Sequence, residues 1–325
     1  MQLSEIYKLV QEDLARVESQ IKSVSEVDSP GLAELSSYIL AGGKGIRPAL
    51  TLLSGKFCHY NLDLLLPMAT AVELMHTATL VHDDAIDNSP VRRGRPTINE
   101  VWGEDKAILL GDYLFAKAGE FVASTGNLRV IKLFSQILQT ISGGELDQSF
   151  DAFNLEQTRD HYLQRISSKT ASLFSMATES GAILSQAPEE SIEVLREYGY
   201  NLGIAFQIVD DVLDFIGTEE EMGKPVGSDL AQGTLTLPAM LLLERYPDDN
   251  PVKELFSSND MPEGDKQERI KQAIELVCNS PIVQECYAVA SDYCARACHK
   301  LGLLPDNTSR QALKDLADLV ISRKR

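Results

Sequence analysis

Apolar residues recur along this chain at intervals of three and four positions, which is the period of an amphipathic helix. The first such stripe consists of Leu3, Ile6, Val10, Leu14, Val17 and Ile21. Alternating runs typical of strands are hard to find. The pattern predicts helices over residues 3–21, 30–41, 63–87, 103–125, 127–150, 156–185 and 189–216, and again from about 235 to the end. We therefore expect an all-α fold, a single-domain helical bundle over residues 1–325.

Two turn-rich segments interrupt the helical pattern. The segment "NSPVRRGRP" follows the helix that ends near residue 87, and "DFIGTEEEMGKPVGSDLAQGT" follows the helix that ends near residue 216. Proline, glycine and asparagine at these points are typical of turns. The second segment is longer than an ordinary connection, which favours a lid or a binding loop. No internal repeat or linker divides the chain, so we expect its C-terminal third to form a peripheral helical layer.

Composition narrows the class of protein. The chain has 325 residues, of which 44% are hydrophobic and 24% are charged, as in an ordinary globular protein. Its net charge of −18 argues against a nucleic-acid-binding protein, because phosphate backbones require basic surfaces. An anionic substrate remains compatible with this charge, since a bound metal ion reverses the local sign.

The sequence also carries information about location. No uninterrupted apolar run reaches the ~18 residues needed to span a membrane, so we expect no transmembrane segment. The N-terminus is amphipathic and of mixed charge, unlike a signal peptide. The five cysteines are odd in number and do not suggest a disulfide framework. A cytoplasmic location is the resulting expectation.

Two clusters of aspartates share one spacing. The segment "LVHDDAID" contains Asp83, Asp84 and Asp87, and "FQIVDDVLD" contains Asp210, Asp211 and Asp214. On a helix the first and last members of each cluster lie on one face, and the middle member lies beside them. Such closely spaced carboxylates repel one another unless cations lie between them, and hard oxygen ligands favour Mg²⁺ or Mn²⁺. The clusters therefore predict a site that holds a diphosphate through divalent ions.

Two other interpretations of the clusters are less consistent with the sequence. A solvated helix end remains an adequate explanation for a single cluster, but two copies, each embedded in an apolar helix, argue against it. A pair of carboxylates for glycoside hydrolysis needs no basic phosphate receptor. This chain has such receptors: "GGKGIRP" supplies Lys44 and Arg47, and "VRRGRP" supplies Arg92 and Arg93. Lysine and arginine are the side chains that bind phosphate groups.

The ordered set of segments resembles the trans-isoprenyl diphosphate synthases, also called polyprenyl synthetases. The set runs from "GGKGIRP" through "ELMHTATLVHDDAIDNSPVRRGRPT", "GGELDQ", "SKTASLF" and "GIAFQIVDDVLD" to "GKPVGSDL". The resemblance implies an isoprenoid-synthase helical bundle around a central active-site cavity. It also implies a prenyl-group transferase that condenses isopentenyl diphosphate head-to-tail with an allylic diphosphate, to give an all-E product. Homodimerisation is the family expectation.

The resemblance assigns roles to individual residues. It implies that the six aspartates hold Mg²⁺ on the allylic diphosphate. It implies that Arg92 and Lys169 contact this diphosphate, that Lys224 closes over it, and that Thr170 and Gln207 lie near its reacting end. The expected receptor for isopentenyl diphosphate consists of Lys44, Arg47, His76 and Arg93. One departure is Thr234, where many short-chain members have a lysine, so a phosphate contact at that position is not expected.

Three residues on the helix before the first cluster bear on product length. Short-chain members carry bulky aromatics four or five positions before the cluster, whereas this chain has Thr79 and Ala78 there, with Met75 further back. By this resemblance we expect a long-chain product of about seven to ten isoprene units (C35 to C50), because small residues leave room for a long tail. The competing interpretation is that Ala78 and Thr79 only allow tight helix packing.

Three alternative functions remain for comparison. A short-chain synthase, making farnesyl or geranylgeranyl diphosphate, differs only in product length. A class I terpene cyclase shares the first aspartate motif but lacks the segment "GGKGIRP". A non-catalytic subunit is disfavoured, because both aspartate clusters and the basic segments are complete.

Overall fold

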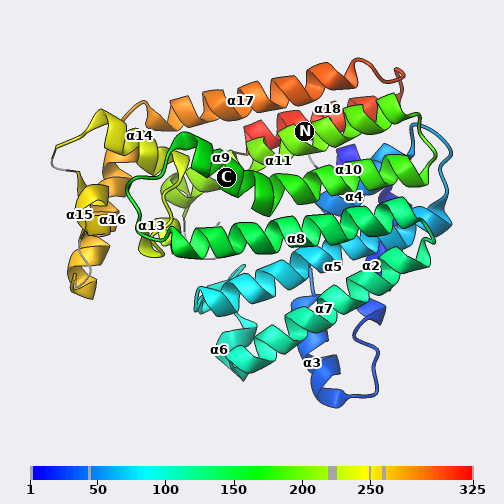
Figure 1. Cartoon of the computed structure of the whole chain (residues 1–325), viewed down its shortest axis with the longest axis horizontal. Helices are drawn as coiled ribbons and strands as arrows, with labels where there is room; N and C mark the ends of the chain where they lie inside the picture. The colour runs from blue at the N-terminus through cyan, green and yellow to red at the C-terminus, as the bar shows by residue number, and fades with distance from the viewer. Residues whose placement is uncertain (1–2, 43–44, 219–224, 249, 258–260, 324–325) are drawn as a thin grey trace.

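The computed structural model describes residues 3–42, 45–218, 225–248, 250–257 and 261–323. Apart from one two-stranded hairpin, the regular secondary structure of these residues is helical, which confirms the predicted all-α fold (Figure 1). The N-terminal half contains α1 (Leu3–Ile6), η1 (Tyr7–Leu9), α2 (Gln11–Ser23), α3 (Pro30–Ile39), α4 (Ile46–Gly55), α5 (Leu62–Ile86), β1 (Val91–Arg92), β2 (Arg95–Pro96), α6 (Ile98–Trp102), α7 (Glu104–Ser124) and α8 (Leu128–Phe150). The remainder contains α9 (Arg159–Ile166), η2 (Ser167–Ala171), α10 (Ser172–Leu184), α11 (Glu189–Ile216), α13 (Ser228–Ala231), α14 (Leu237–Arg245), α15 (Pro251–Ser257), α16 (Glu263–Cys278), α17 (Ile282–Leu301) and α18 (Thr308–Ser322).

The helix α5 occupies the centre of the bundle and packs against α2, α4, α7 and α10. Among the described helices, α5 alone is long and apolar enough by length and composition to cross a membrane. However, 61% of its most apolar window is buried inside the molecule. Packing against other helices explains this apolar composition, since a helix that is hydrophobic on all sides is typical of a core.

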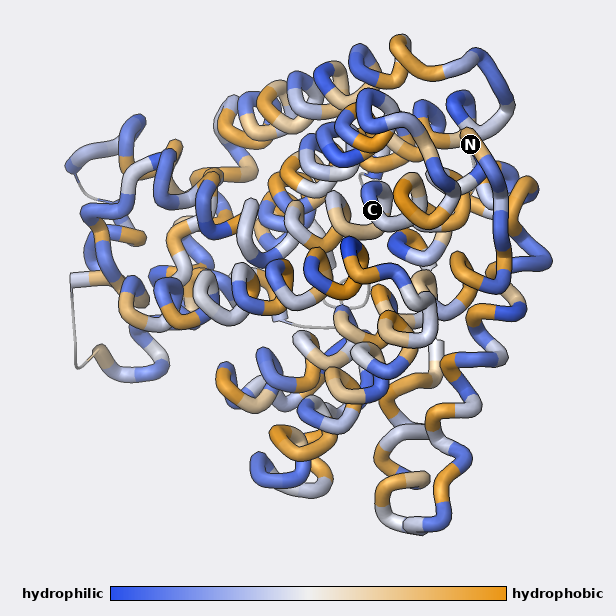
Figure 2. The backbone as a smooth tube through the Cα atoms, turned by 45° about the vertical axis from the view of Figure 1, so that its right-hand side comes forward, coloured by the Kyte–Doolittle hydropathy of each residue, from blue (hydrophilic) through white to orange (hydrophobic). Residues whose placement is uncertain are grey.

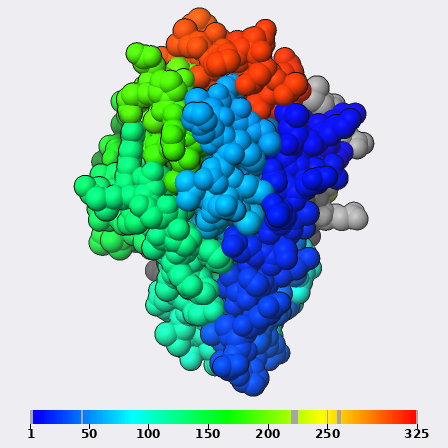
Figure 3. Space-filling view, turned by 90° about the vertical axis from the view of Figure 1, so that its right-hand side faces the viewer, coloured from blue at the N-terminus to red at the C-terminus, as the bar shows by residue number. Residues whose placement is uncertain are grey.

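Amphipathic helices surround this centre. Hydrophobic and hydrophilic residues alternate along them, as Figure 2 shows. Buried apolar residues form a cluster that extends from Ile6 to Val320. The helix α17 packs along α11 and against the C-terminal helix α18, while α14, α15 and α16 lie at one end of the bundle. Figure 3 views the opposite end, where residues near the start of α5 (light blue) are flanked by N-terminal segments, α7–α8 and the C-terminal region.

Three local features differ from the predicted helices. The opening stripe is one helix in prediction but three short elements in the structure, because Val10 leaves the helical conformation with φ −130°. A small antiparallel hairpin, β1–β2, was not predicted, since strands of two residues leave no alternating pattern. Its turn places Arg93 and Gly94 at positive φ, the conformation of a tight hairpin turn. The predicted helix over 156–185 consists of α9, η2 and α10 in succession.

The segment η2 is a π-helical stretch fixed between two neighbouring helices. A Cβ atom added to Gly203 of α11 would lie 2.6 Å from the Ala171 Cα atom, and one added to Gly144 of α8 would lie 2.7 Å from the Ser168 Cβ atom. Glycine at both positions allows α8 and α11 to approach η2 closely. Since π-helical turns occur often at functional sites, this clamped segment marks a candidate site.

Candidate active site

Both aspartate clusters lie at the C-terminal ends of long helices, α5 and α11. Asp83 and Asp84 are 8% and 3% exposed, and Asp211 and Asp214 are 3% and 1% exposed. The C-terminal end of a helix carries partial negative charge, so it is an unfavourable place for a carboxylate. Four buried carboxylates at two such ends therefore require positive charge or hydrogen-bond donors nearby.

Two cations compensate the first cluster. The Arg92 Nε atom donates to both oxygens of Asp84, at 2.7 and 2.8 Å. The Lys169 Nζ atom lies 3.0 Å from an oxygen of Asp83. Burial nevertheless raises the pKa of Asp84 to about 6, against the opposing effect of Arg92. Burial also raises the pKa of Asp87, which lies one residue beyond the last turn of α5.

Lys169 has a second carboxylate partner that was not among the predicted site residues. Its Nζ atom lies 2.8 Å from an oxygen of Glu145, on the last turns of α8. Burial alone would lower the pKa of Lys169, but the charges of Asp83 and Glu145 raise it above its ordinary value. The only sequence signal for Glu145 was its position in the segment "GGELDQ".

In the second cluster, neutral donors surround Asp211. The Tyr162 hydroxyl donates to one of its oxygens at 2.7 Å, and the Gln207 side-chain amide donates to the other at 2.8 Å. The Thr170 hydroxyl in turn donates to the Gln207 oxygen at 2.6 Å. Burial raises the pKa of Asp211 to about 7, although these hydrogen bonds oppose the shift. Nothing in the sequence pattern indicated Tyr162.

Asp214 and Asp210 connect the second cluster to distant segments. Asp214 accepts hydrogen bonds from the Ser228 hydroxyl at 2.9 Å and from the Asp229 backbone N–H at 3.2 Å. Asp210 forms an ion pair of 3.1 Å with Arg323, near the C-terminus. The Arg323 guanidinium also lies over the Phe206 ring. The second cluster thus contacts segments that follow it along the chain.

Consecutive residues of η2 link the two clusters. Lys169 reaches Asp83 on α5, and its neighbour Thr170 bonds to Gln207, which bonds to Asp211 on α11. One short segment therefore contacts both clusters, the second through Gln207. The predicted residues Asp83, Lys169, Thr170, Gln207 and Asp211 come together in one contact chain.

Arg47 forms a second basic region of the site, apart from Arg92 and Lys169. The Arg47 guanidinium lies 4.8 Å from the centre of the Phe174 ring, and its Nε atom is buried without a hydrogen-bond partner among the described residues. Burial lowers the pKa of Arg47 to about 10, while Glu73 and Asp210 oppose the shift. Arg47 thus remains a cation at neutral pH, with a donor available for an anion.

Two of the residues predicted to bind isopentenyl diphosphate together with Arg47, namely His76 and Arg93, lie in the described part of the chain. Burial, with the charges of Arg47, Arg93 and Arg92, lowers the pKa of His76 well below its ordinary value. A neutral imidazole is therefore the form that this surrounding favours. Arg93 lies at the turn of the β1–β2 hairpin. The predicted phosphate ligands Lys44 and Lys224 lie outside the described residues.

The three predicted chain-length residues occupy one stretch of α5. Met75 and Ala78 are fully buried, and the half-buried Thr79 donates its hydroxyl hydrogen to the His76 backbone oxygen at 2.8 Å. On the facing helix α7, Phe115 contacts the His82 ring edge-on. Ala78 therefore lies in the interior of the bundle, one turn before the first aspartate cluster.

The aspartates offer only oxygen donors, the chemistry that suits a hard divalent cation. Within the described residues, no three His, Cys, Asp or Glu side chains are gathered as a ready metal site. The contacts give the reason, because Arg92, Lys169 and Gln207 occupy carboxylate oxygens. The raised pKa values of Asp84 and Asp211 show that these protein donors compensate burial incompletely. The residues therefore fit a cation that would replace some of these donors.

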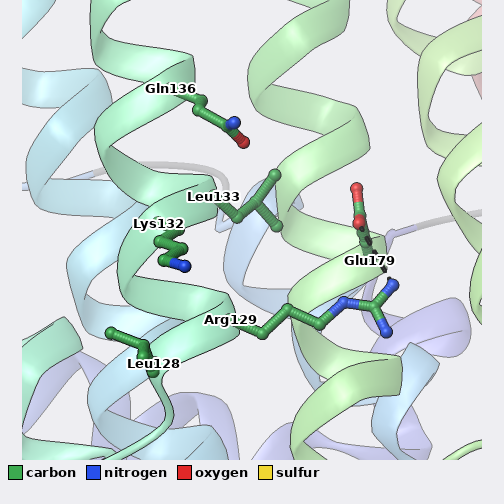
Figure 4. A pocket seen from close by; sticks show the side chains of 6 residues that line it. All are labelled: Leu128, Arg129, Lys132, Leu133, Gln136 and Glu179. Atoms are coloured by element: carbon green, nitrogen blue, oxygen red, sulfur yellow. Dashed lines mark ion pairs between the residues drawn. The ribbon is translucent and has the colours of Figure 1, made fainter.

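A pocket elsewhere on the surface is not part of this site. It measures about 440 Å³ and is lined by Leu128, Arg129, Lys132, Leu133, Gln136 and Glu179 (Figure 4). These residues come from the start of α8 and from α10, whereas Glu145 lies near the other end of α8. Arg129 is already paired with Glu189 through two hydrogen bonds. The chemistry of the aspartates, rather than pocket size, locates the candidate active site, and the expected central cavity stays a prediction.

Comparison with known proteins agrees with the geometry. The sequence model of the polyprenyl synthetase family matches residues 29–277. The chain belongs to this family. It is 39% identical to component 2 of heptaprenyl diphosphate synthase from Geobacillus stearothermophilus, over 98% of each chain. It is 36% identical to the chloroplastic solanesyl-diphosphate synthase 2 of Oryza sativa, over 99% of this chain and 80% of that one.

A solved structure gives the same result. The polyprenyl synthase of Caulobacter crescentus, complexed with calcium and isoprenyl diphosphate, superposes with a TM-score of 0.94 at 33% identity. The alignment covers 100% of this chain and 98% of that one. Polyprenyl synthetases are prenyl-group transferases that use diphosphate substrates and a divalent metal. The predicted family, fold and enzyme class are thereby confirmed.

The raised pKa of Asp211 predicts how the metal-free polyprenyl synthetase responds to pH. Its carboxyl group has an ordinary pKa of 3.8 when unfolded and of about 7 when folded. Between these values the folded state holds a proton that the unfolded state has released, so stability falls as pH rises. From pH 5 to pH 8 this group should remove about 3 kcal/mol of the free energy of unfolding.

Asp211→Asn lacks this titrating carboxyl group. We therefore expect its free energy of unfolding to fall by about 3 kcal/mol less than that of the wild type between pH 5 and pH 8. Urea unfolding with a chelator present would measure the difference. Asp147→Asn, which changes an exposed carboxyl group on α8, serves as the control. Equal pH dependence in Asp211→Asn and the wild type would contradict this account of the second cluster.

Proposed function

We propose that the chain condenses isopentenyl diphosphate head-to-tail with an allylic diphosphate to make an all-E polyprenyl diphosphate. The observation that carries the proposal is the link through η2, which joins both aspartate clusters to Lys169 and Thr170. The cation Arg47 lies near the second cluster, since the charge of Asp210 affects its pKa. The site thus supplies two sets of groups for two diphosphates.

Each set has a distinct task in this proposal. We assign the aspartates to Mg²⁺, with Mn²⁺ as a substitute, because both ions prefer carboxylate oxygens. The ions would supply Lewis acidity to the departing diphosphate. Arg92 and Lys169 stabilise the negative charge that develops as the allylic C–O bond breaks. Arg47, the neutral His76 and Arg93 hold isopentenyl diphosphate so that its double bond faces the allylic carbon.

A product assay tests the function directly. The purified chain receives radiolabelled isopentenyl diphosphate, Mg²⁺ and one of several allylic primers, and the products are chromatographed. We expect labelled polyprenyl diphosphate from the wild type, and turnover reduced on the order of a thousandfold in Asp83→Ala, because charge stabilisation in the transition state is lost. Asp147→Asn is the matched control and should retain activity.

Two outcomes of this assay would support the alternative functions. Release of hydrocarbon from a prenyl diphosphate without isopentenyl diphosphate would indicate a terpene cyclase. An inactive wild-type chain would indicate a non-catalytic subunit. Near-normal turnover in Asp83→Ala would remove the role assigned to the first cluster.

We propose a long-chain product of about seven to ten isoprene units, since small side chains leave space for a long tail. Ala78 supports this proposal, because it is fully buried in the bundle one turn before the first cluster. The similarity to heptaprenyl and solanesyl diphosphate synthases also supports it. A short-chain product is the less supported alternative.

Enlarging residue 78 should shorten the product. In Ala78→Phe, the added ring fills interior space that the growing tail would otherwise enter, so we expect a product shorter by at least two isoprene units. Chromatography of the dephosphorylated products measures the change. Ala123→Phe makes the same substitution at an exposed position of α7 and should leave the length unaltered. An unaltered length in Ala78→Phe would mean that Ala78 only serves helix packing.

We also propose that the chain forms a homodimer. Large apolar side chains are exposed along α7 and α8: Ile108 43%, Leu109 66%, Leu128 65%, Leu146 61% and Phe150 85%. Exposed apolar side chains of this kind are typical of interaction surfaces. Because one relative is named component 2 of its synthase, a different partner subunit is the competing possibility. Light scattering should give twice the chain mass of 35.8 kDa, and a monomer mass would contradict the proposal.

A further inference from the structure

We propose that Glu145 is a positioning residue that keeps Lys169 at the allylic diphosphate once a divalent ion has taken Asp83. The proposal rests on the function proposed above. It concerns a residue that contacts neither substrate nor reacting atoms in that mechanism. Its role is to determine where a neighbouring cation lies.

Lys169 forms ion pairs with two carboxylates that lie on different helices. Its ammonium group lies 3.0 Å from Asp83 on α5 and 2.8 Å from Glu145 on α8. An oxygen that coordinates a divalent ion is a poor acceptor for an ammonium group, because the two cations repel. When Asp83 binds the ion, Glu145 is therefore the carboxylate, among the ion-pair partners of Lys169 in the described residues, that still holds Lys169 in place.

The backbone fixes this arrangement independently of charge. Gly144 precedes Glu145 and allows α8 to approach η2, where Ser168 precedes Lys169. A Cβ atom at residue 144 would lie 2.7 Å from the Ser168 Cβ atom, so a larger residue would move α8 away. The neighbouring Gly143 has no atom within 4 Å of an added Cβ. Of these two glycines, only Gly144, the immediate neighbour of Glu145, is in close contact with η2.

Simple electrostatics and positioning predict opposite signs. Glu145 is negative, so on charge alone its removal should tighten the binding of a diphosphate anion. If Glu145 positions Lys169, its removal should instead weaken that binding when a divalent ion is present, because a long, flexible lysine loses its fixed place. The sign of the change distinguishes the two explanations.

The experiment compares Glu145→Met with Glu145→Gln. Both remove the charge, but only glutamine keeps an oxygen that accepts a hydrogen bond from Lys169. With Mg²⁺ present, we expect Glu145→Met to bind inorganic pyrophosphate about tenfold more weakly by calorimetry, and Glu145→Gln to lie between it and the wild type. The KM for the allylic diphosphate should rise in the same order, while the KM for isopentenyl diphosphate stays constant.

A second pair of variants leaves the charge of Glu145 unchanged and tests the position of α8 relative to η2. We expect Gly144→Ala to weaken pyrophosphate binding with Mg²⁺ and to raise the KM for the allylic diphosphate. Gly143→Ala should change neither. Glu179→Gln, at a half-buried carboxylate of α10 near Arg129, controls for loss of a negative charge elsewhere.

The possible failures are separable. Equal or tighter pyrophosphate binding in Glu145→Met, or identical changes in the methionine and glutamine variants, would overturn the positioning role while leaving prenyl transfer intact. Absence of prenyl transfer in the wild type would overturn the proposed function instead. Calorimetry without divalent ions is the last measurement. There we expect Glu145→Met to bind pyrophosphate more tightly than the wild type, because only the loss of negative charge then acts. Weaker pyrophosphate binding without divalent ions would also overturn the positioning role.

Discussion

The structure depends on the burial of carboxylates at the C-terminal ends of α5 and α11. Burial and the helix ends both disfavour negative charge there, so the surrounding fold has to supply compensation. It does so with different groups in the two clusters. Arg92 and Lys169 bring positive charge to the first, and Tyr162 and Gln207 bring neutral donors to Asp211. The raised pKa values of Asp84 and Asp211 show that this compensation is partial. Carboxylates whose burial is only partly compensated favour the binding of cations.

Lys169 and Thr170 contribute to this compensation because η2 lies between the clusters. Successive side chains of a helix point about 100° apart, so adjacent residues face different neighbours. The π-helical stretch changes this local geometry while Gly144 and Gly203 allow flanking helices to come close. As a result, Lys169 faces α5 and α8, and Thr170 faces α11. A local deformation of one helix thus sets the relation between two sets of aspartates.

The sequence predicted those parts of the site that follow local rules. Helix period and the repeated aspartate spacing depend on neighbours along the chain, so both are predictable from the order of residues alone. Contacts between distant segments follow no such rule. Tyr162, Glu145 and Arg323 reach the aspartates only through the packing of other helices, and they were missed. The break at Val10 and the two-residue strands were missed because a short irregularity leaves the average apolar period unaltered.

The two basic regions of the site are prepared for anions in different ways. Arg92 and Lys169 are bonded to Asp84 and Asp83 at 2.7 to 3.0 Å, and these carboxylates belong to the clusters assigned to the divalent ions. Arg47 lies over the Phe174 ring, and its Nε atom has no hydrogen-bond partner among the described residues. The negative charges of Glu73 and Asp210 act on Arg47 and oppose the lowering of its pKa by burial. The allylic side therefore couples anion binding to cation binding, because the same carboxylates hold both. The Arg47 side lacks this coupling, since among the described residues Arg47 has no ion pair for an anion to displace. Binding of the two diphosphates is thus governed by different requirements within one site.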